Sequence, residues 1–124
     1  MNATLALRLA ALAGFLAVGL GAFGAHGLKT TLEANATLTV WQTAALYHLV
    51  HAVILLVLAT RPAVARWPFT LFGCGIVIFS GSLYLLAVTN VKWLGAITPI
   101  GGLCLLGGWL ALAFVRTPPH PPAR

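Results

Sequence analysis

Residues 41–60 read WQTAALYHLVHAVILLVLAT and contain no Asp, Glu, Lys or Arg. A helix of about 20 residues rises roughly 30 Å, which matches the hydrocarbon thickness of a bilayer. The stretch nevertheless contains His48 and His51, which lie three positions apart and therefore on neighbouring faces of one helix. Polar side chains at that depth are energetically expensive and indicate a functional site. The stretch therefore predicts a membrane-spanning helix that carries a polar site.

The composition of the whole chain also indicates an integral membrane protein. Of the 124 residues, 60% are hydrophobic and 6% are charged, whereas soluble domains contain about 25% charged residues. The net charge of +6 comes from basic residues that lie apart at segment ends and form no patch, which argues against nucleic acid as a partner. Such residues instead set the orientation in the membrane and contact anionic headgroups. We expect the lipid bilayer to be the main partner.

Three further apolar segments accompany the first one and predict a single transmembrane domain. The expected spans are residues 5–27, 40–60, 68–89 and 94–115, with a tight turn at residues 90–93. The connections are short, so consecutive helices should be antiparallel neighbours. The proline-rich tail, residues 117–124, is expected to be disordered. The predicted fold is all-α, a compact four-helix membrane bundle.

Basic residues are distributed unequally between the two ends of this bundle. Four spans place both termini on the same side, and arginines accumulate on that side, whereas the other side has Lys29 and Lys92. Because positive residues accumulate in the cytoplasm, both termini should be cytoplasmic. The residues expected on the terminal side are Arg8, Arg61, Arg66, Arg116 and Arg124.

Small residues recur at spacings that allow helix backbones to approach closely. Within residues 41–60, small residues flank His48 on one face, which indicates that this face contacts a neighbouring helix. Pro99 has no N–H, so the carbonyl of Gly95 loses its helical partner and the fourth span should begin irregularly. The residues expected at helix contacts are Ala17, Gly21, Ala25, Ala44, Ala52, Gly81, Gly101 and Gly102.

The polar residues of all four spans fall at similar depths, in the half of the membrane away from the termini. His48, for example, lies about eight residues, or roughly 12 Å, inside its span. If the helices form a bundle, these groups can converge. The predicted polar cluster consists of His26, Tyr47, His48, His51, Ser80, Ser82, Tyr84, Thr98 and Pro99.

This cluster has several possible roles. Buried histidines and serines can fasten helices to one another by hydrogen bonds. His48 or His51 could instead bind a ligand or carry a proton. A metal or haem site has less support, because metal sites need several ligands and no carboxylate lies near these histidines. No nucleophile, base and acid form a set, so we expect no catalytic residues, no cofactor and no metal, and a protein that is not an enzyme.

Four stretches together resemble a known family. They are GAFGAHGLK at residues 21–29, WQTAALYHLVHA at 41–52, FSGSLY at 79–84 and LGAITPIGG at 94–102. In this order they resemble the DUF423 family of small membrane proteins, which includes YgdD-like and transmembrane protein 256-like proteins. The resemblance implies a multi-pass protein of unknown function, in the inner membrane of bacteria, with no established catalytic residues. His48 stands where a Gln is usual in this family.

Three hypotheses about function follow from the sequence. The first is a structural or accessory component that contacts a larger membrane complex or a second copy of itself through its small-residue faces. The second is a transporter or channel-like protein for protons or a small solute that uses the polar cluster. The third is a cofactor-binding protein with His51 as the ligand.

Overall fold

A computed structural model describes residues 1–116, and within this range every regular element is a helix. The predicted disorder of the tail concerns residues outside the described range. The elements are α1 (Ala3–Ala25), α2 (Lys29–Ala34), α3 (Leu38–Ala59), α4 (Arg66–Gly75), the π-helix η1 (Ile76–Ser80), α5 (Gly81–Thr89), the 3-10 helix η2 (Lys92–Ala96) and α6 (Thr98–Ala113).

Four helices in the described range are long and apolar enough to cross a membrane. They cover Ala3–Ala25, Leu38–Ala59, Arg66–Thr89 and Lys92–Ala113. The third is a single span in which α4, η1 and α5 follow one another without a break. The all-α fold with four membrane helices is therefore confirmed, and each predicted span starts and ends within a few residues of the observed one.

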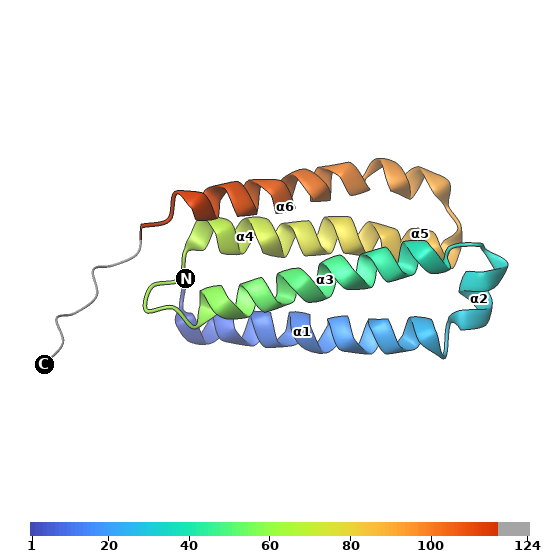
Figure 1. Ribbon diagram of the computed structural model, residues 1–124, viewed down its shortest axis with the longest axis horizontal. Coiled ribbons are helices and arrows are strands. Elements are labelled where there is room, and N and C mark those ends of the chain that lie inside the picture. The colour runs from blue at the N-terminus through green and yellow to red at the C-terminus, as the bar shows by residue number, and fades with distance from the viewer. Residues whose placement is uncertain (117–124) are drawn as a thin grey trace, which may run out of the picture.

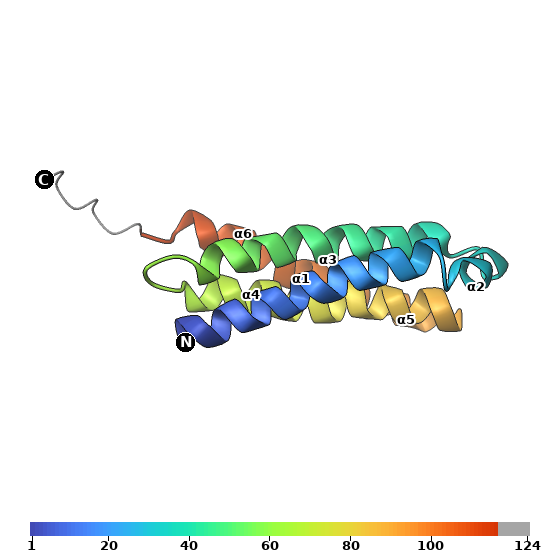
Figure 2. The ribbon, with the colours of Figure 1, turned by 90° about the horizontal axis from the view of Figure 1, so that it is seen from below.

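The four spans lie side by side in the order of the sequence (Figure 1). α1 packs on α3, α3 packs on the α4–α5 span, and that span packs on α6. Within the described residues, α1 makes no comparable backbone contact with α4, α5 or α6. The view from below (Figure 2) shows α1 crossing α3 obliquely. Each span is thus antiparallel to its sequence neighbour, and α1 and α6 form the two edges of the arrangement.

Two apolar cores lie at opposite ends of the helices. The core at the terminal end centres on Phe72, which is fully buried, and on Leu58. The core at the other end consists of Leu32, Trp41 and Ala87. Between the two cores lie the buried polar side chains of α3, η1 and α5. The packing therefore encloses a polar layer within the apolar helices.

The closest helix contacts depend on glycines, but only partly on the expected ones. A Cβ added at Gly101 would lie 2.7 Å from the Cα of Phe79, which places the α6 backbone directly against η1. Gly75 and Gly108, which sequence reasoning missed, make comparable close approaches to Leu105 and Phe72. A residue without a side chain is needed at these three positions, and they let α6 approach α4 and η1 closely.

The buried face of α1 agrees only in part with the predicted small-residue face. A Cβ at Gly21 would meet no atom within 4 Å, and Ala25 is exposed, whereas Gly24 is buried against the Trp41 indole. The buried face consists of Ala6, Ala10, Ala17 and Gly24. Gly21 and Ala25 therefore make no close helix contact within the described residues, because the buried residues of α1 recur alternately about every three and four positions and not every four. Ala17, Ala44 and Ala52 are buried as expected, whereas Gly81 has open space beside it and Gly102 makes only an ordinary contact with Phe79.

The connections at the non-terminal end are more ordered than expected. α2 forms within the first connection, and the Asn35 amide and Thr37 hydroxyl donate to the Ala87 carbonyl at 3.0 and 2.6 Å. Asn90 ends α5 in the left-handed conformation, with φ of 57°, as a tight turn requires. η2 precedes α6, so the predicted irregular start of the fourth span is confirmed.

Candidate functional site

α3 supplies both buried histidines, but it directs them to different neighbouring helices. His48 and His51 are each 5% exposed. Their separation of three positions rotates one ring about 60° from the other around the helix axis. His48 meets Tyr84 on α5, and His51 meets Trp109 on α6. The predicted cluster is therefore divided around α3 and does not converge on one point.

His48 links α3 to α5. Its Nδ1 lies 3.1 Å from the Tyr84 hydroxyl, and the two rings meet edge to face with centroids 6.0 Å apart. The Tyr84 ring also lies against Trp41, with centroids 4.6 Å apart. The backbone carbonyl of Ala13 on α1 is a further polar group beside the imidazole. His48 is thus placed where three helices meet.

His51 uses both ring nitrogens within the protein. The indole Nε1 of Trp109 donates to Nε2 over 3.1 Å, and Nδ1 lies 2.7 Å from the Tyr47 carbonyl. An indole N–H can only donate, so Nε2 must be the unprotonated nitrogen. Nδ1 then carries the proton and donates it to the carbonyl of Tyr47. The geometry therefore fixes one neutral tautomer of His51.

This tautomer limits what His51 can do chemically. To bind haem or a metal ion, Nε2 would have to release Trp109, which packs edge to face on both His51 and Phe72. Within residues 1–116, no three His, Cys, Asp or Glu side chains lie close enough to hold a metal ion. The arrangement suits a helix fastener better than a ligand site.

The hydroxyl groups of Ser80 and Ser82 fasten helices in a similar way. Ser80, at the end of the π-helix η1, donates to the Ala44 carbonyl of α3 over 2.8 Å. Ser82 contacts the Thr98 hydroxyl of α6 at 2.7 Å. Residues two positions apart lie about 200° from each other around a helix axis. Ser80 and Ser82 therefore meet two different neighbours, α3 and α6.

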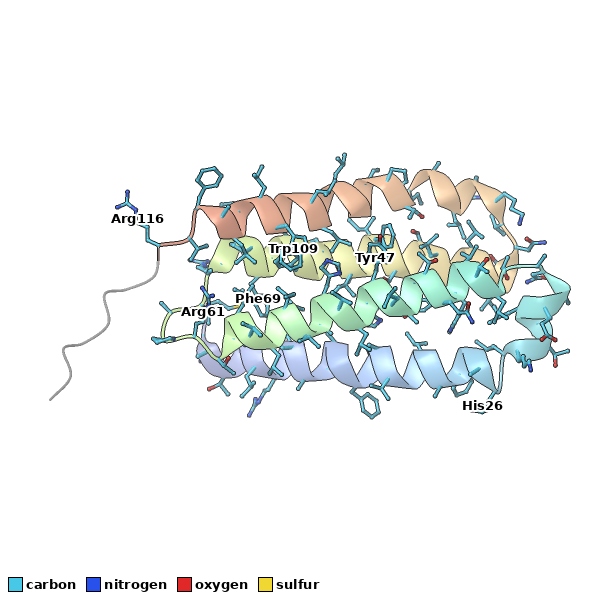
Figure 3. The ribbon with its side chains drawn as sticks, in the orientation of Figure 1. His26, Tyr47, Arg61, Phe69, Trp109 and Arg116 are labelled. Atoms are coloured by element: carbon cyan, nitrogen blue, oxygen red, sulfur yellow. The ribbon has the colours of Figure 1, made fainter. Side chains whose placement is uncertain are left out.

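Not all of the predicted polar residues join this layer. His26 is exposed at the end of α1, far from the labelled Tyr47 and Trp109 (Figure 3). Pro99 is exposed at the start of α6 and contributes no polar contact. Tyr47 is 43% exposed, and its ring lies against Phe79 with centroids 4.7 Å apart. The position of a residue in the sequence sets its depth along a span, but not the direction of its side chain around the helix axis.

Two apolar grooves flank the polar layer on different sides of α3. The first, which we call the His48 groove, has a volume of about 450 Å³ and is lined by Leu16, Phe69 and Tyr84 among others. It runs between α1 and the α4–α5 span. The second, the Tyr47 groove, has a volume of about 520 Å³ and lies between α3 and α6. Each histidine thus borders one groove.

Two tryptophans have roles that their positions in the sequence do not reveal. Trp109 is the partner of His51. Tryptophans near span ends commonly lie at the headgroup level, but Trp41 is 3% exposed and its indole donates to the Leu20 carbonyl over 2.9 Å. Trp67 and Trp93 are 78% and 67% exposed near span ends, as expected for interfacial residues. Gly24 is the residue in the sequence that could have indicated the burial of Trp41 against α1, since a glycine leaves room for a large ring.

Comparison with known proteins identifies the family. The profile described as "Protein of unknown function (DUF423)" matches residues 20–102. The chain belongs to the DUF423 family. It is 47% identical to a UPF0382 membrane protein of Staphylococcus saprophyticus, with 84% of this chain and 89% of the relative covered. It is 44% identical to the UPF0382 membrane protein YwdK of Bacillus subtilis (84% and 89% covered) and 37% identical to one of Schizosaccharomyces pombe (85% and 95% covered).

The DUF423 match confirms the family resemblance and the assignment to a membrane. The relatives are named as membrane proteins, and their names give no specific activity. The matched region includes every predicted polar residue from His26 to Pro99, whereas Trp109 lies beyond it. No solved structure matches this chain. The protein is therefore a member of an uncharacterised membrane protein family.

Proposed function

We propose that this DUF423 protein is a structural or accessory component of the membrane, without enzymatic activity. One observation carries the proposal: within residues 1–116, every buried side-chain nitrogen and oxygen atom has a hydrogen-bond partner in the protein. Catalytic and transport sites instead keep polar groups available to a substrate. The buried polar groups here link α3 to α5, α3 to α6 and α5 to α6, which supports a role in holding the helices at fixed positions.

The edges of the arrangement support an accessory role. α1 and α6 lie at the two edges of the arrangement, and they expose apolar side chains such as Phe15 and Leu110. These faces suit either lipid or the helices of a partner protein or second copy. The small extramembrane portion leaves little room for a soluble catalytic site.

We further propose that the protein lies in the inner membrane of a bacterium and that both of its termini are in the cytoplasm. Arg61 and Arg116 lie at the same end of the helices, and His26 lies at the other (Figure 3). Glu33, the one acidic residue of the chain, is on α2 at the His26 end. The terminal end has more basic residues than the His26 end, and this difference supports the proposed orientation. Alkaline phosphatase fused after Arg116 should be inactive, and the same enzyme inserted in α2 should be active.

Native mass spectrometry of the protein, gently extracted from its own membrane, tests the accessory role. We expect a complex in which a second membrane protein or another copy is present in a fixed ratio. The Gly101→Ala variant, which disturbs the α6 packing, should lose this complex, whereas Gly102→Ala should retain it. A bare monomer that catalyses proton or solute flux in proteoliposomes would refute the proposal and favour transport.

A further inference from the structure

The His48 groove has the shape of a channel for a chain rather than of a pocket for a compact solute. One wall is α1 from Leu9 to Leu20, and the other is the α4–α5 span from Phe69 to Tyr84. At 1.5 Å per residue these walls are about 17 and 22 Å long. His48 and Leu55 of α3 lie between them, and the groove is open at its side. A long apolar groove that faces lipid suits an extended hydrocarbon chain.

The terminal end of this groove is basic. Arg66 precedes Phe69 by three positions and Gly73 by seven, so it lies on the stripe of α4 that forms the groove wall. Arg66 also lines a smaller cavity of about 360 Å³ together with Trp67 and Thr70. On the facing helix, exposed Arg8 lies one turn before Leu12. Neither arginine lines the groove itself, and by helix register both lie just beyond its terminal end.

No carboxylate side chain balances this charge. The single acidic residue of the chain is Glu33, which lies on α2 at the opposite end of the helices. A guanidinium group prefers a planar or tetrahedral oxyanion that accepts two parallel hydrogen bonds. At the surface of a bilayer, the abundant oxyanion of this type is a lipid phosphate. The basic residues are thus complementary to the phosphate of a lipid, and the apolar groove is complementary to its acyl chain.

We propose that the groove binds an anionic glycerophospholipid. The phosphate lies at Arg66, where the Trp67 indole and the Thr70 hydroxyl supply further donors. One acyl chain extends along the groove toward His48 and Tyr84. This lipid site goes beyond the accessory role and does not depend on it.

The headgroup part of the site can be tested by a matched charge deletion. The full chain, delipidated in an uncharged detergent, is titrated with phosphatidylglycerol or phosphatidylcholine of identical acyl chains, and bound lipid is counted by native mass spectrometry. The wild type should prefer phosphatidylglycerol, and Arg66→Gln should weaken its binding about fivefold. Arg116→Gln removes the same charge at the same end but outside the groove, so it should have little effect. Equal binding of both lipids by the wild type, or equal losses in both variants, would overturn the proposal.

The acyl-chain part of the site can be tested by filling the groove. Gly73 lines the groove, and a Cβ there meets no atom within 4 Å, so Gly73→Leu should occupy the groove without displacing a helix. Binding should weaken on the order of tenfold, the equivalent of about two methylene groups left unburied. Gly21→Leu, which also has free space but does not line the groove, is the control. Should Gly73→Leu lose its helical circular dichroism, Val77→Phe replaces it, since Val77 lines the groove and is 72% exposed. Unchanged binding by the folded groove variant would show that no chain lies there.

Discussion

Replacing Gly101 with alanine tests whether the α6 packing depends on contact between two backbones. The new Cβ would lie 2.7 Å from Phe79 Cα and 2.8 Å from the carbonyl carbon of Ile78, and it would also meet the Phe79 amide nitrogen. Carbon atoms in contact lie about 3.5–4.0 Å apart, so α6 must move roughly 1 Å away from η1. Backbone atoms cannot rotate aside as a flexible side chain can.

The expected loss of stability combines three effects. Overpacking costs about 1–3 kcal/mol, and a hydrogen bond between membrane helices contributes about 0.6 kcal/mol. The Ser82–Thr98 contact, now 2.7 Å, lies one turn from Gly101 and would lengthen beyond the range of hydroxyl hydrogen bonds. Alanine favours the helix over glycine by about 0.5–1 kcal/mol, which offsets part of the loss. We expect a net destabilisation of about 1–3 kcal/mol.

The neighbouring glycine provides a matched control for this prediction. A Cβ at Gly102 would lie 3.7 Å from Phe79 Cδ2, an ordinary contact, so Gly102→Ala should be neutral or slightly stabilising. Unfolding of both variants from mild detergent into dodecyl sulfate, followed by far-UV circular dichroism, measures the difference. If Gly101→Ala proves as stable as Gly102→Ala, α6 does not approach η1 as closely as the structure shows.

Two further substitutions test the contacts of the polar layer. His51→Leu removes the acceptor of the Trp109 indole and should lower the free energy of unfolding by about 0.6–1.7 kcal/mol; in a double-mutant cycle with Trp109→Phe, strictly additive losses would show that the two rings do not interact. Gly24→Ala should displace the Trp41 indole, because a Cβ there would lie within 3.1 Å of its Cε2, and so change the near-UV circular dichroism, whereas Gly21→Ala should leave the spectrum as it is.

The sequence determined the class of protein and the course of the chain through the membrane. Its apolar composition and its long uncharged segments indicate that these segments lie in the bilayer. In lipid the backbone N–H and C=O groups find no water, so they must pair with one another within helices. Asn90 and Pro99 marked a turn and an irregular helix start at positions where the structure has them. A turn and a helix start can be predicted from the sequence, because each depends on the backbone of a few consecutive residues.

Only the tertiary structure decided which way each helix faces. In a soluble protein, polar and apolar residues separate around a helix, but in a membrane the lipid and the helix contacts are both apolar, so this signal is weak. The sequence therefore did not distinguish Gly24 from Gly21 on α1, nor pair His51 with Trp109. Close packing of rings and backbones sets these rotations, because a glycine or an indole fits only where its partner on another helix leaves the matching space.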